Sequence, residues 1–203
     1  CEVFPVLESA EQAQTATTLG RIPKTLAMIR AGKPVKIVCW GDSVTCGGDA
    51  TCEEARYTSV FARRLKQRFP DANIEVVVVA VGGSSSHQWL YPDALKVPEQ
   101  WRRMCDWGKI EREKPTLLTI EFVNDAWLKP EQVEATYGDV MERLKPFGTE
   151  IILITPHFTM PSWMGFKDLR DKDSRPYVMG LRQFAAKRGV ALADASARWE
   201  HLW

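Results

Sequence analysis

The stretch VKIVCWGDSVTCGG, residues 35–48, shows the fold class and the first candidate functional residue together. A continuous apolar run stops at Gly41, is followed by Asp42 and Ser43, and then gives way to small residues. Continuous apolar character indicates a strand buried on both faces, as in a parallel sheet. A turn after such a strand needs a glycine or an aspartate, but it does not need a serine. Ser43 is therefore a candidate for chemistry at the end of a buried strand.

Further short apolar runs follow, and segments with helical spacing separate them. The runs are residues 74–81, 117–123, 151–154 and, more weakly, 190–193. The helical stripes are residues 57–65, 133–144 and 177–185. Strand alternating with helix predicts an α/β three-layer sandwich, with a flavodoxin-like parallel five-stranded sheet and helices on both faces. In such sheets, ligands bind at the carboxyl ends of the strands.

Length and composition indicate an ordinary globular chain. The 203 residues are 45% hydrophobic and contain no repeat or linker, so we expect one domain over residues 1–203. Residues 1–34 are expected to be a leading helical segment that ends at Gly32 and Pro34. The net charge of +1 argues against a nucleic-acid partner. No apolar run is long enough for a membrane span, and the first residues do not resemble a signal peptide.

The five cysteines leave one question open. Cys46 and Cys52 flank a short loop, where a disulfide and two free thiols are equally compatible with the sequence. A disulfide would favour a secreted or periplasmic protein, and without it the compartment is undecided. No Cys or His spacing fits a zinc site, so no metal is expected.

Residues suited to ester chemistry follow the predicted strands. Ser43 follows the first strand, Gly82 and Gly83 follow the second, and Asn124 follows the third. A serine nucleophile needs a base and an oxyanion hole, which backbone N–H groups beside glycines and an asparagine amide can form. Taken singly, each motif is also typical of a turn. The glycine-rich fingerprints of nucleotide sites are absent from the sequence.

Taken in order, these motifs resemble the SGNH (GDSL-type) hydrolase family. GDS follows strand one, a glycine follows strand two and ND follows strand three, so that the resemblance covers residues 35–125 in motif terms. It implies a serine esterase that needs no metal or organic cofactor. Ser43 would be the nucleophile, and its N–H, the N–H of Gly83 (or Gly82) and the Asn124 amide would form the oxyanion hole. The block GDSV replaces GDSL, and Phe122 stands where the family usually has a glycine.

The general base is the main departure from the family pattern, which has Asp-x-x-His near its C-terminus. The histidines of this chain are His87, His157 and His201, and none has an aspartate three residues before it. His201 is nearest to the expected place, close to Asp194 and Glu200, but residues 195–203 have helical spacing. We therefore expect the motif to fall beyond the last residue given, and His201 to lie away from Ser43.

Tryptophan usage suggests the substrate. Trp89, Trp127 and Trp163 each come shortly after a strand end, and indole faces suit sugar rings, although core packing is the alternative. His87 and His157 also follow strand ends and are expected to face the crevice. The expected substrate-binding residues are thus Asp42, which braces the turn, together with Gly82, His87, Trp127 and His157.

The preferred function is hydrolysis of small acyl esters, chiefly acetyl esters on carbohydrate, through an acyl-serine intermediate. The expected partner is a small-molecule or saccharide ester. Two other classes remain open from sequence. One is a non-catalytic carbohydrate-binding domain on the same scaffold, and the other is a flavodoxin-like binder of a phosphorylated ligand.

Overall fold

The computed structural model describes residues 21–159 and 173–200. A five-stranded sheet with the strand order β2-β1-β3-β4-β5 forms its centre, and every neighbouring pair is parallel. The strands are β1 Val35–Gly41, β2 Ile74–Ala80, β3 Leu117–Glu121, β4 Glu150–Ile154 and β5 Ala191–Ala193. The predicted strands and the flavodoxin-like fold are confirmed.

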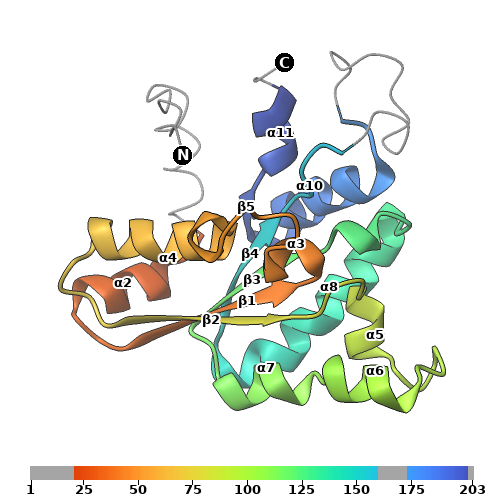
Figure 1. Ribbon diagram of the computed structural model, residues 1–203, viewed down its shortest axis with the longest axis horizontal. Coiled ribbons are helices and arrows are strands. Elements are labelled where there is room, and N and C mark those ends of the chain that lie inside the picture. Colours follow the sequence, from red (N-terminus) through yellow and green to blue (C-terminus); the bar gives the residue numbers. More distant parts are fainter. Residues whose placement is uncertain (1–20, 160–172, 201–203) are drawn as a thin grey trace.

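Helices cover both faces of the sheet, as predicted. The α-helices are α2 Pro23–Arg30, α3 Ser43–Cys46, α4 Tyr57–Arg68, α5 Ser86–Leu90, α6 Glu99–Met104, α7 Gly108–Glu113, α8 Pro130–Leu144, α10 Pro176–Arg188 and α11 Ala195–Glu200. Short 3₁₀ turns are η1 Glu53–Ala55, η2 Val123–Asp125 and η3 Lys145–Phe147. Helices α2 and α4 pack on one face, whereas α5, α7, α8 and α10 pack on the other (Figure 1).

The region between β2 and β3 was not predicted in detail. It contains α5, α6 and α7, which are five or six residues long. Such helices are too short for an apolar stripe to recur, so periodicity cannot detect them. The longer helices α4, α8 and α10 lie where the stripes predicted them.

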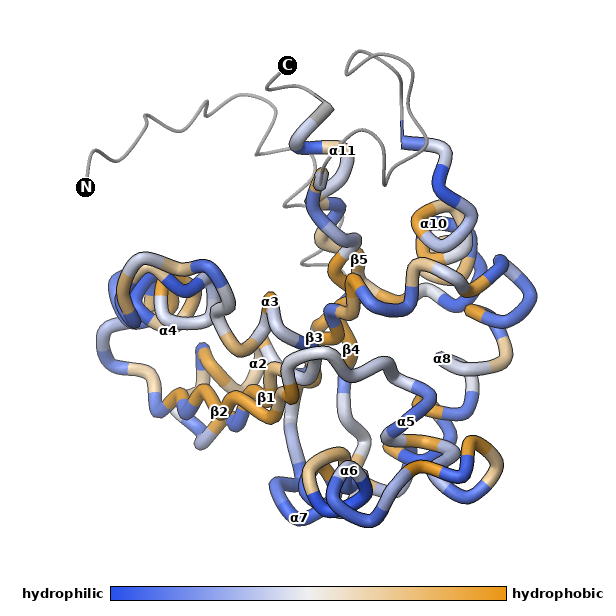
Figure 2. The backbone as a smooth tube through the Cα atoms, turned by 45° about the vertical axis from the view of Figure 1, so that its right-hand side comes forward, coloured by the Kyte–Doolittle hydropathy of each residue, from blue (hydrophilic) through white to orange (hydrophobic). Residues whose placement is uncertain are grey.

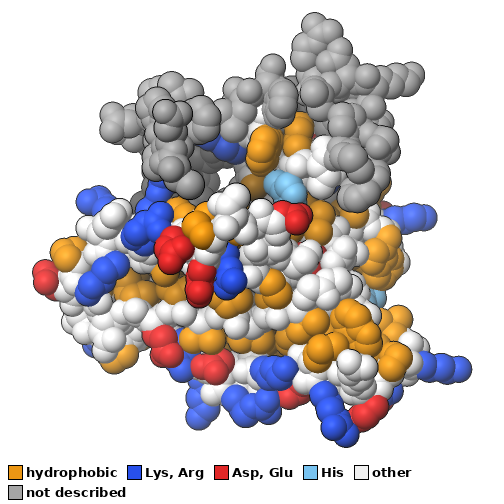
Figure 3. Space-filling view, viewed as in Figure 1, with side chains coloured by type: hydrophobic (Ala, Val, Ile, Leu, Met, Phe, Trp, Pro, Cys, Tyr) orange, Lys and Arg blue, Asp and Glu red, His pale blue; other side chains and the backbone are white. Residues whose placement is uncertain are grey.

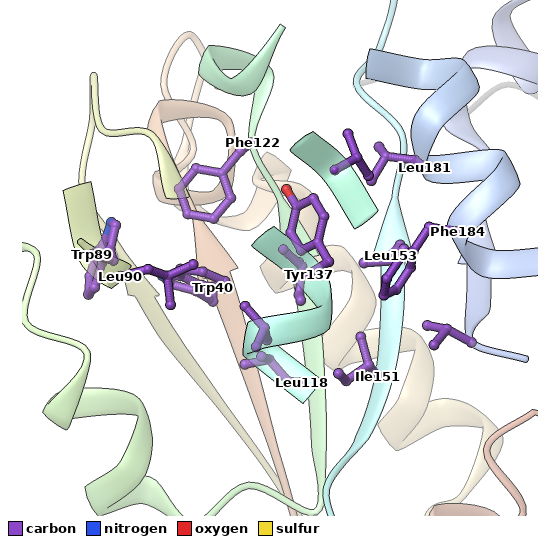
Figure 4. Close-up of a cluster of buried hydrophobic side chains, with 14 of the residues drawn as sticks. Trp40, Trp89, Leu90, Leu118, Phe122, Tyr137, Ile151, Leu153, Leu181 and Phe184 are labelled. Carbon is purple, nitrogen blue, oxygen red and sulfur yellow. The ribbon is translucent and has the colours of Figure 1, made fainter. Parts of the chain in front are cut away.

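The larger core is built around Trp40 of β1, which is fully buried. Its ring makes edge-to-face contacts with Trp89 at 6.1 Å, Trp107 at 5.2 Å and Phe122 at 4.7 Å between centroids. Figure 4 shows Trp89, Leu90 and Phe122 around Trp40. Phe122 therefore contributes to the core.

For Trp89, the core-packing alternative is the correct one. Trp89 is 2% exposed and its Nε1 donates a hydrogen bond to Ser84 Oγ at 3.0 Å, so it cannot stack on a sugar. Trp89 is instead a core residue that packs against Trp40. Trp163 lies outside the described residues.

The smaller core lies on the opposite face of the sheet. It joins Ile29 of α2 to Ile37 of β1, with Phe61 and Leu65 of α4 packed against them. Figure 2 shows the hydrophobic strands running between the two helical layers. Helix α2 is followed by Gly32 at φ +63°, and the Lys33 N–H donates to the Met28 carbonyl at 2.9 Å. Helix α2 thus ends close to where the leading helical segment was predicted to end, whereas residues 1–20 of that segment lie outside the described residues.

Cys46 and Cys52 are both free thiols in the structure. The disulfide alternative is therefore corrected, and its support for a secreted or periplasmic location is lost. None of the described helices has the length and apolar character needed to cross a membrane.

Candidate active site

Three strand ends bring the predicted ester-chemistry residues together. The chain passes from β1 to β2 on one side and returns to β3 on the other, so β1 and β3 flank the point where the strand order reverses. Ser43 begins α3 after β1, and a Cβ built on Gly82 would lie 3.7 Å from Ser43 Cβ. Asn124 lies in η2 after β3, and its N–H donates to Asp42, the neighbour of Ser43. Ser43 is half-buried, while Gly82, Gly83 and Asn124 are exposed.

Asp42 joins the end of β1 to the end of β3. Its Oδ1 accepts the Val44 N–H at 3.1 Å, and its Oδ2 accepts the Asn124 N–H at 2.9 Å. Burial raises the pKa of this carboxyl, against the opposite effect of the backbone donors. Because the side chain is fully buried, it fits the bracing role expected of it and not a direct contact with substrate.

Gly41 explains why the strand stops where it does. A Cβ at this position would lie 2.1 Å from Thr45 Oγ1 and 2.3 Å from the Glu121 carbonyl oxygen. Only glycine permits so close an approach of α3 to β3. In the second loop, Gly83 has φ +79°, a backbone conformation that favours glycine, and it follows Gly82, the glycine that lies beside Ser43.

Asn124 and Asp125 have different roles although they are adjacent. Asn124 Nδ2 donates to the Ser84 carbonyl at 3.2 Å, which leaves its second N–H available to a ligand. Asp125 is fully buried and accepts the Ser86 N–H at 2.9 Å and the Tyr137 hydroxyl at 3.0 Å. Burial raises the pKa of Asp125 to about 6. Asp125 thereby ties the loop after β2 to the loop after β3.

Glu121 is a residue of the site region that sequence reasoning missed. It ends β3, is 3% exposed, and accepts a hydrogen bond from Thr45 Oγ1 at 3.0 Å, while its Oε1 has no hydrogen-bond partner. Burial, and next the charge of Asp42, raise the pKa of Glu121 to about 8, so the carboxyl is largely protonated at neutral pH. The available signal was a single acidic residue inside the apolar run LLTIEFV.

Two of the three histidines lie among the described residues. His87 Nε2 is 2.8 Å from Thr136 Oγ1, and burial lowers the pKa of this imidazole. His157 follows β4 and is half-buried. Burial and then Arg175 lower the pKa of His157, against an opposite effect of Asp42.

Within the described ranges, no imidazole is hydrogen-bonded to the Ser43 hydroxyl. His201 lies outside them, so its expected distance from Ser43 stays a prediction. The same part of the chain contains no group of three His, Cys, Asp or Glu side chains that could hold a metal ion.

The ends of β4 and β5 carry a second polar network, which was not predicted. Asp173 is buried against Arg175, with 2.7 Å between Oδ2 and Nη2, and accepts the Ser196 hydroxyl at 2.6 Å. Asp194 pairs with Arg182 at 2.8 Å and begins α11 by accepting the Ala197 N–H. Burial alone would raise the pKa of each aspartate, but the arginine partners and hydrogen bonds lower both.

The parallel sheet and the order of the strand-end motifs agree with an SGNH-type hydrolase. The model of the GDSL-like Lipase/Acylhydrolase family matches residues 39–203. The chain belongs to this family of carboxylic ester hydrolases.

Solved structures of esterases share the fold. A two-domain esterase (CEX) active on acetylated mannans has a TM-score of 0.63 and 18% identity over 88% of this chain, which spans only 42% of that protein. A mutant of Axe2, an acetyl-xylooligosaccharide esterase from Geobacillus Stearmophilus, has a TM-score of 0.59 and 22% identity, covering 83% of this chain and 79% of that one. TesA has a TM-score of 0.55 and 17% identity, with 77% and 76% covered. No curated protein matches the chain.

Proposed function

We propose that the chain is a serine esterase that removes small acyl groups, chiefly acetyl, from esterified carbohydrate. The observation that carries the proposal is the convergence of Ser43, Gly82, Gly83 and Asn124 at the reversal of strand order, where Asp42 joins two of the three loops. The loops after β1, β2 and β3 would thereby contribute a hydroxyl, a glycine turn and the second amide N–H of Asn124 to one site.

The proposed reaction uses these groups in order. Ser43 Oγ attacks the ester carbonyl carbon and gives its proton to a general base, which we expect to be a histidine outside the described residues. The Ser43 N–H, the Gly83 (or Gly82) N–H and Asn124 Nδ2 hold the oxyanion. Collapse of the tetrahedral intermediate breaks the bond to the alcohol oxygen, which takes the proton from the base. Water then hydrolyses the acyl-serine by the same steps.

Two observations favour a saccharide as the alcohol. Two of the structurally similar proteins act on acetylated mannans or acetyl-xylooligosaccharides. Trp127, three residues after Asn124, is 53% exposed, so an aromatic side chain is available near the proposed site.

The test is turnover of p-nitrophenyl acetate by the wild-type chain and by Ser43→Ala. We expect the variant to lose turnover, because losing a serine nucleophile costs on the order of 10⁶ in kcat in a serine hydrolase. Its unfolding temperature should stay within a few degrees, since Ser43 Oγ makes no hydrogen bond in the described structure. Ser59→Ala, a half-buried serine on α4, is the matched control and should retain activity.

Equal turnover in Ser43→Ala and wild type would remove Ser43 from the mechanism. A wild-type chain that binds oligosaccharide but hydrolyses no ester would support the non-catalytic carbohydrate-binding alternative instead.

A further inference from the structure

Trp127 differs from Trp89 and Trp107 in both the exposure and the hydrogen bonding of its indole. It differs from Trp40, whose N–H also has no partner among the described residues, in being exposed. Trp89 and Trp107 are buried, and their N–H groups donate to Ser84 Oγ and Glu111 Oε1. Trp127 is 53% exposed, and its N–H has no acceptor within the described residues. An exposed indole with an unused donor is available for a ligand that offers both an apolar face and a hydroxyl.

Backbone hydrogen bonds join the residues on either side of Trp127 to η2, the short turn that contains Asn124. The Ala126 N–H donates to the Val123 carbonyl at 3.2 Å, and the Leu128 N–H donates to the Asp125 carbonyl at 2.8 Å. Trp127 therefore extends the same short turn that holds Asn124. Three chain steps limit the Cα separation of these two residues to about 11 Å. When the ester group lies beside Asn124, the sugar that carries it, or the next sugar of the oligosaccharide, can reach Trp127.

The indole is also held in place by a neighbouring ring. Its centroid lies 4.8 Å from that of His87, at an interplanar angle of 85°. His87 is fixed in turn by Thr136 Oγ1 at 2.8 Å and by an edge-to-face contact with Tyr91 at 5.1 Å. A ring ordered before binding loses less entropy when a ligand arrives.

We propose that Trp127, supported by His87, is a platform for a sugar ring of the carbohydrate part of the substrate. The proposal rests on the proposed function and deepens it. Trp127 would bind the carbohydrate without taking part in the acyl transfer, and His87 would be a positioning residue that sets the orientation of the indole.

Figure 3 shows charged side chains of both signs on one face of the molecule. Basic and acidic side chains are interspersed on the face shown, with no large area of a single sign. The other exposed large apolar side chains among the described residues are aliphatic or sulfur-containing, and they are Val78, Leu95 and Met179.

The test compares Trp127→Ala, Trp127→Phe and Leu95→Ala on two substrates, an acetylated oligosaccharide and p-nitrophenyl acetate. Leu95 is 48% exposed and serves as the apolar control. We expect Trp127→Ala to lower kcat/KM for the oligosaccharide about tenfold, which corresponds to about 1.4 kcal/mol, mainly through KM, because the variant loses the ring on which the sugar would stack. Turnover of p-nitrophenyl acetate should stay within about twofold of wild type. Trp127→Phe should recover part of the loss, and Leu95→Ala should change neither substrate.

An equal loss on both substrates would make Trp127 a structural residue and overturn the proposal. An unchanged KM for the oligosaccharide would overturn it as well, while leaving the esterase proposal intact.

Calorimetric titration with the unesterified oligosaccharide separates the two proposals. If the wild-type chain hydrolyses no ester, weaker binding by Trp127→Ala than by wild type still supports the platform. Equal binding by the two proteins refutes it.

Discussion

The buried carboxyls at the ends of β1 and β3 have different hydrogen-bond partners from those near the ends of β4 and β5. At β1 and β3, Asp42, Glu121 and Asp125 accept hydrogen bonds from backbone N–H groups and hydroxyls. Among the described residues no arginine or lysine pairs with them, and burial raises all three pKa values. We call this group the neutral-donor network.

At β4 and β5, Asp173 and Asp194 lie against Arg175 and Arg182, and the pKa values of both aspartates are lowered. We call this group the ion-paired network. Because a buried carboxyl without a cationic partner is costly to ionise, burial raises the pKa values in the neutral-donor network, whereas the arginines lower those in the ion-paired network.

The different pKa shifts of the two networks fit the roles of the regions in which they lie. An oxyanion that develops beside Ser43 would be repelled by full negative charge on nearby carboxyls. The raised pKa of Glu121, about 8, reduces that charge at neutral pH, while N–H dipoles remain to stabilise the oxyanion. The ion-paired network instead anchors α10 and α11, since Asp173 joins Arg175 to Ser196.

The largest effect is expected from Asp173→Ala in the ion-paired network. It leaves the Arg175 guanidinium, 10% exposed, without its carboxylate, and such a loss costs about 3–5 kcal/mol. Urea unfolding monitored by circular dichroism measures it. Glu99→Ala removes an exposed helical ion pair with Arg103 and should cost about 0.3–0.5 kcal/mol. Equal losses in the two variants would show that the ion-paired network contributes no more than a surface pair.

Asn124→Ala should have the next largest effect, and on activity rather than stability. Removing one oxyanion donor lowers kcat about 10²–10³-fold, which corresponds to about 2.7–4 kcal/mol. KM should change much less, because the contact strengthens in the transition state. Steady-state kinetics with p-nitrophenyl acetate separates the two parameters. A large rise in KM with kcat preserved would instead make Asn124 a ground-state binding residue.

Glu121→Gln should have a smaller effect that depends on pH. The folded pKa of about 8 lies above the ordinary value of 4.5, so the folded protein binds the proton more tightly. Stability should therefore fall as the pH rises from 4.5 to 8, by about 1.4 kcal/mol per pKa unit at most. Glutamine keeps an acceptor for Thr45 and carries no charge, so the variant should be more stable than wild type at pH 8–9 and similar at pH 5.

Unfolding temperatures across this pH range test the Glu121 prediction. Parallel curves for wild type and Glu121→Gln would show that Glu121 does not titrate there. The ion-paired network has the opposite sign, because the lowered pKa of Asp173 contributes stability that is lost only as the pH falls through its folded value.

The sequence by itself determined the fold class, because the fold class rests on local patterns, and it indicated the candidate catalytic positions through the order of their motifs. Continuous apolar runs specify strands buried on both faces, and the long amphipathic helices follow from their spacing. Ser43, Gly83 and Asn124 follow predicted strands, and the order of their motifs resembles the SGNH family, which is what made them candidates.

Only the tertiary structure decided which of several residues with similar positions in the sequence are buried, exposed or hydrogen-bonded to one another. Trp89 and Trp127 both follow strand ends, but Trp89 packs on Trp40 whereas Trp127 remains exposed. Asp42 meets Asn124 across 82 residues of chain, a pairing that no local pattern encodes. The proton on Glu121 depends on burial and on the nearby Asp42 charge. Burial, charge proximity and long-range hydrogen bonds arise from the packing of distant segments, so local sequence patterns cannot specify them.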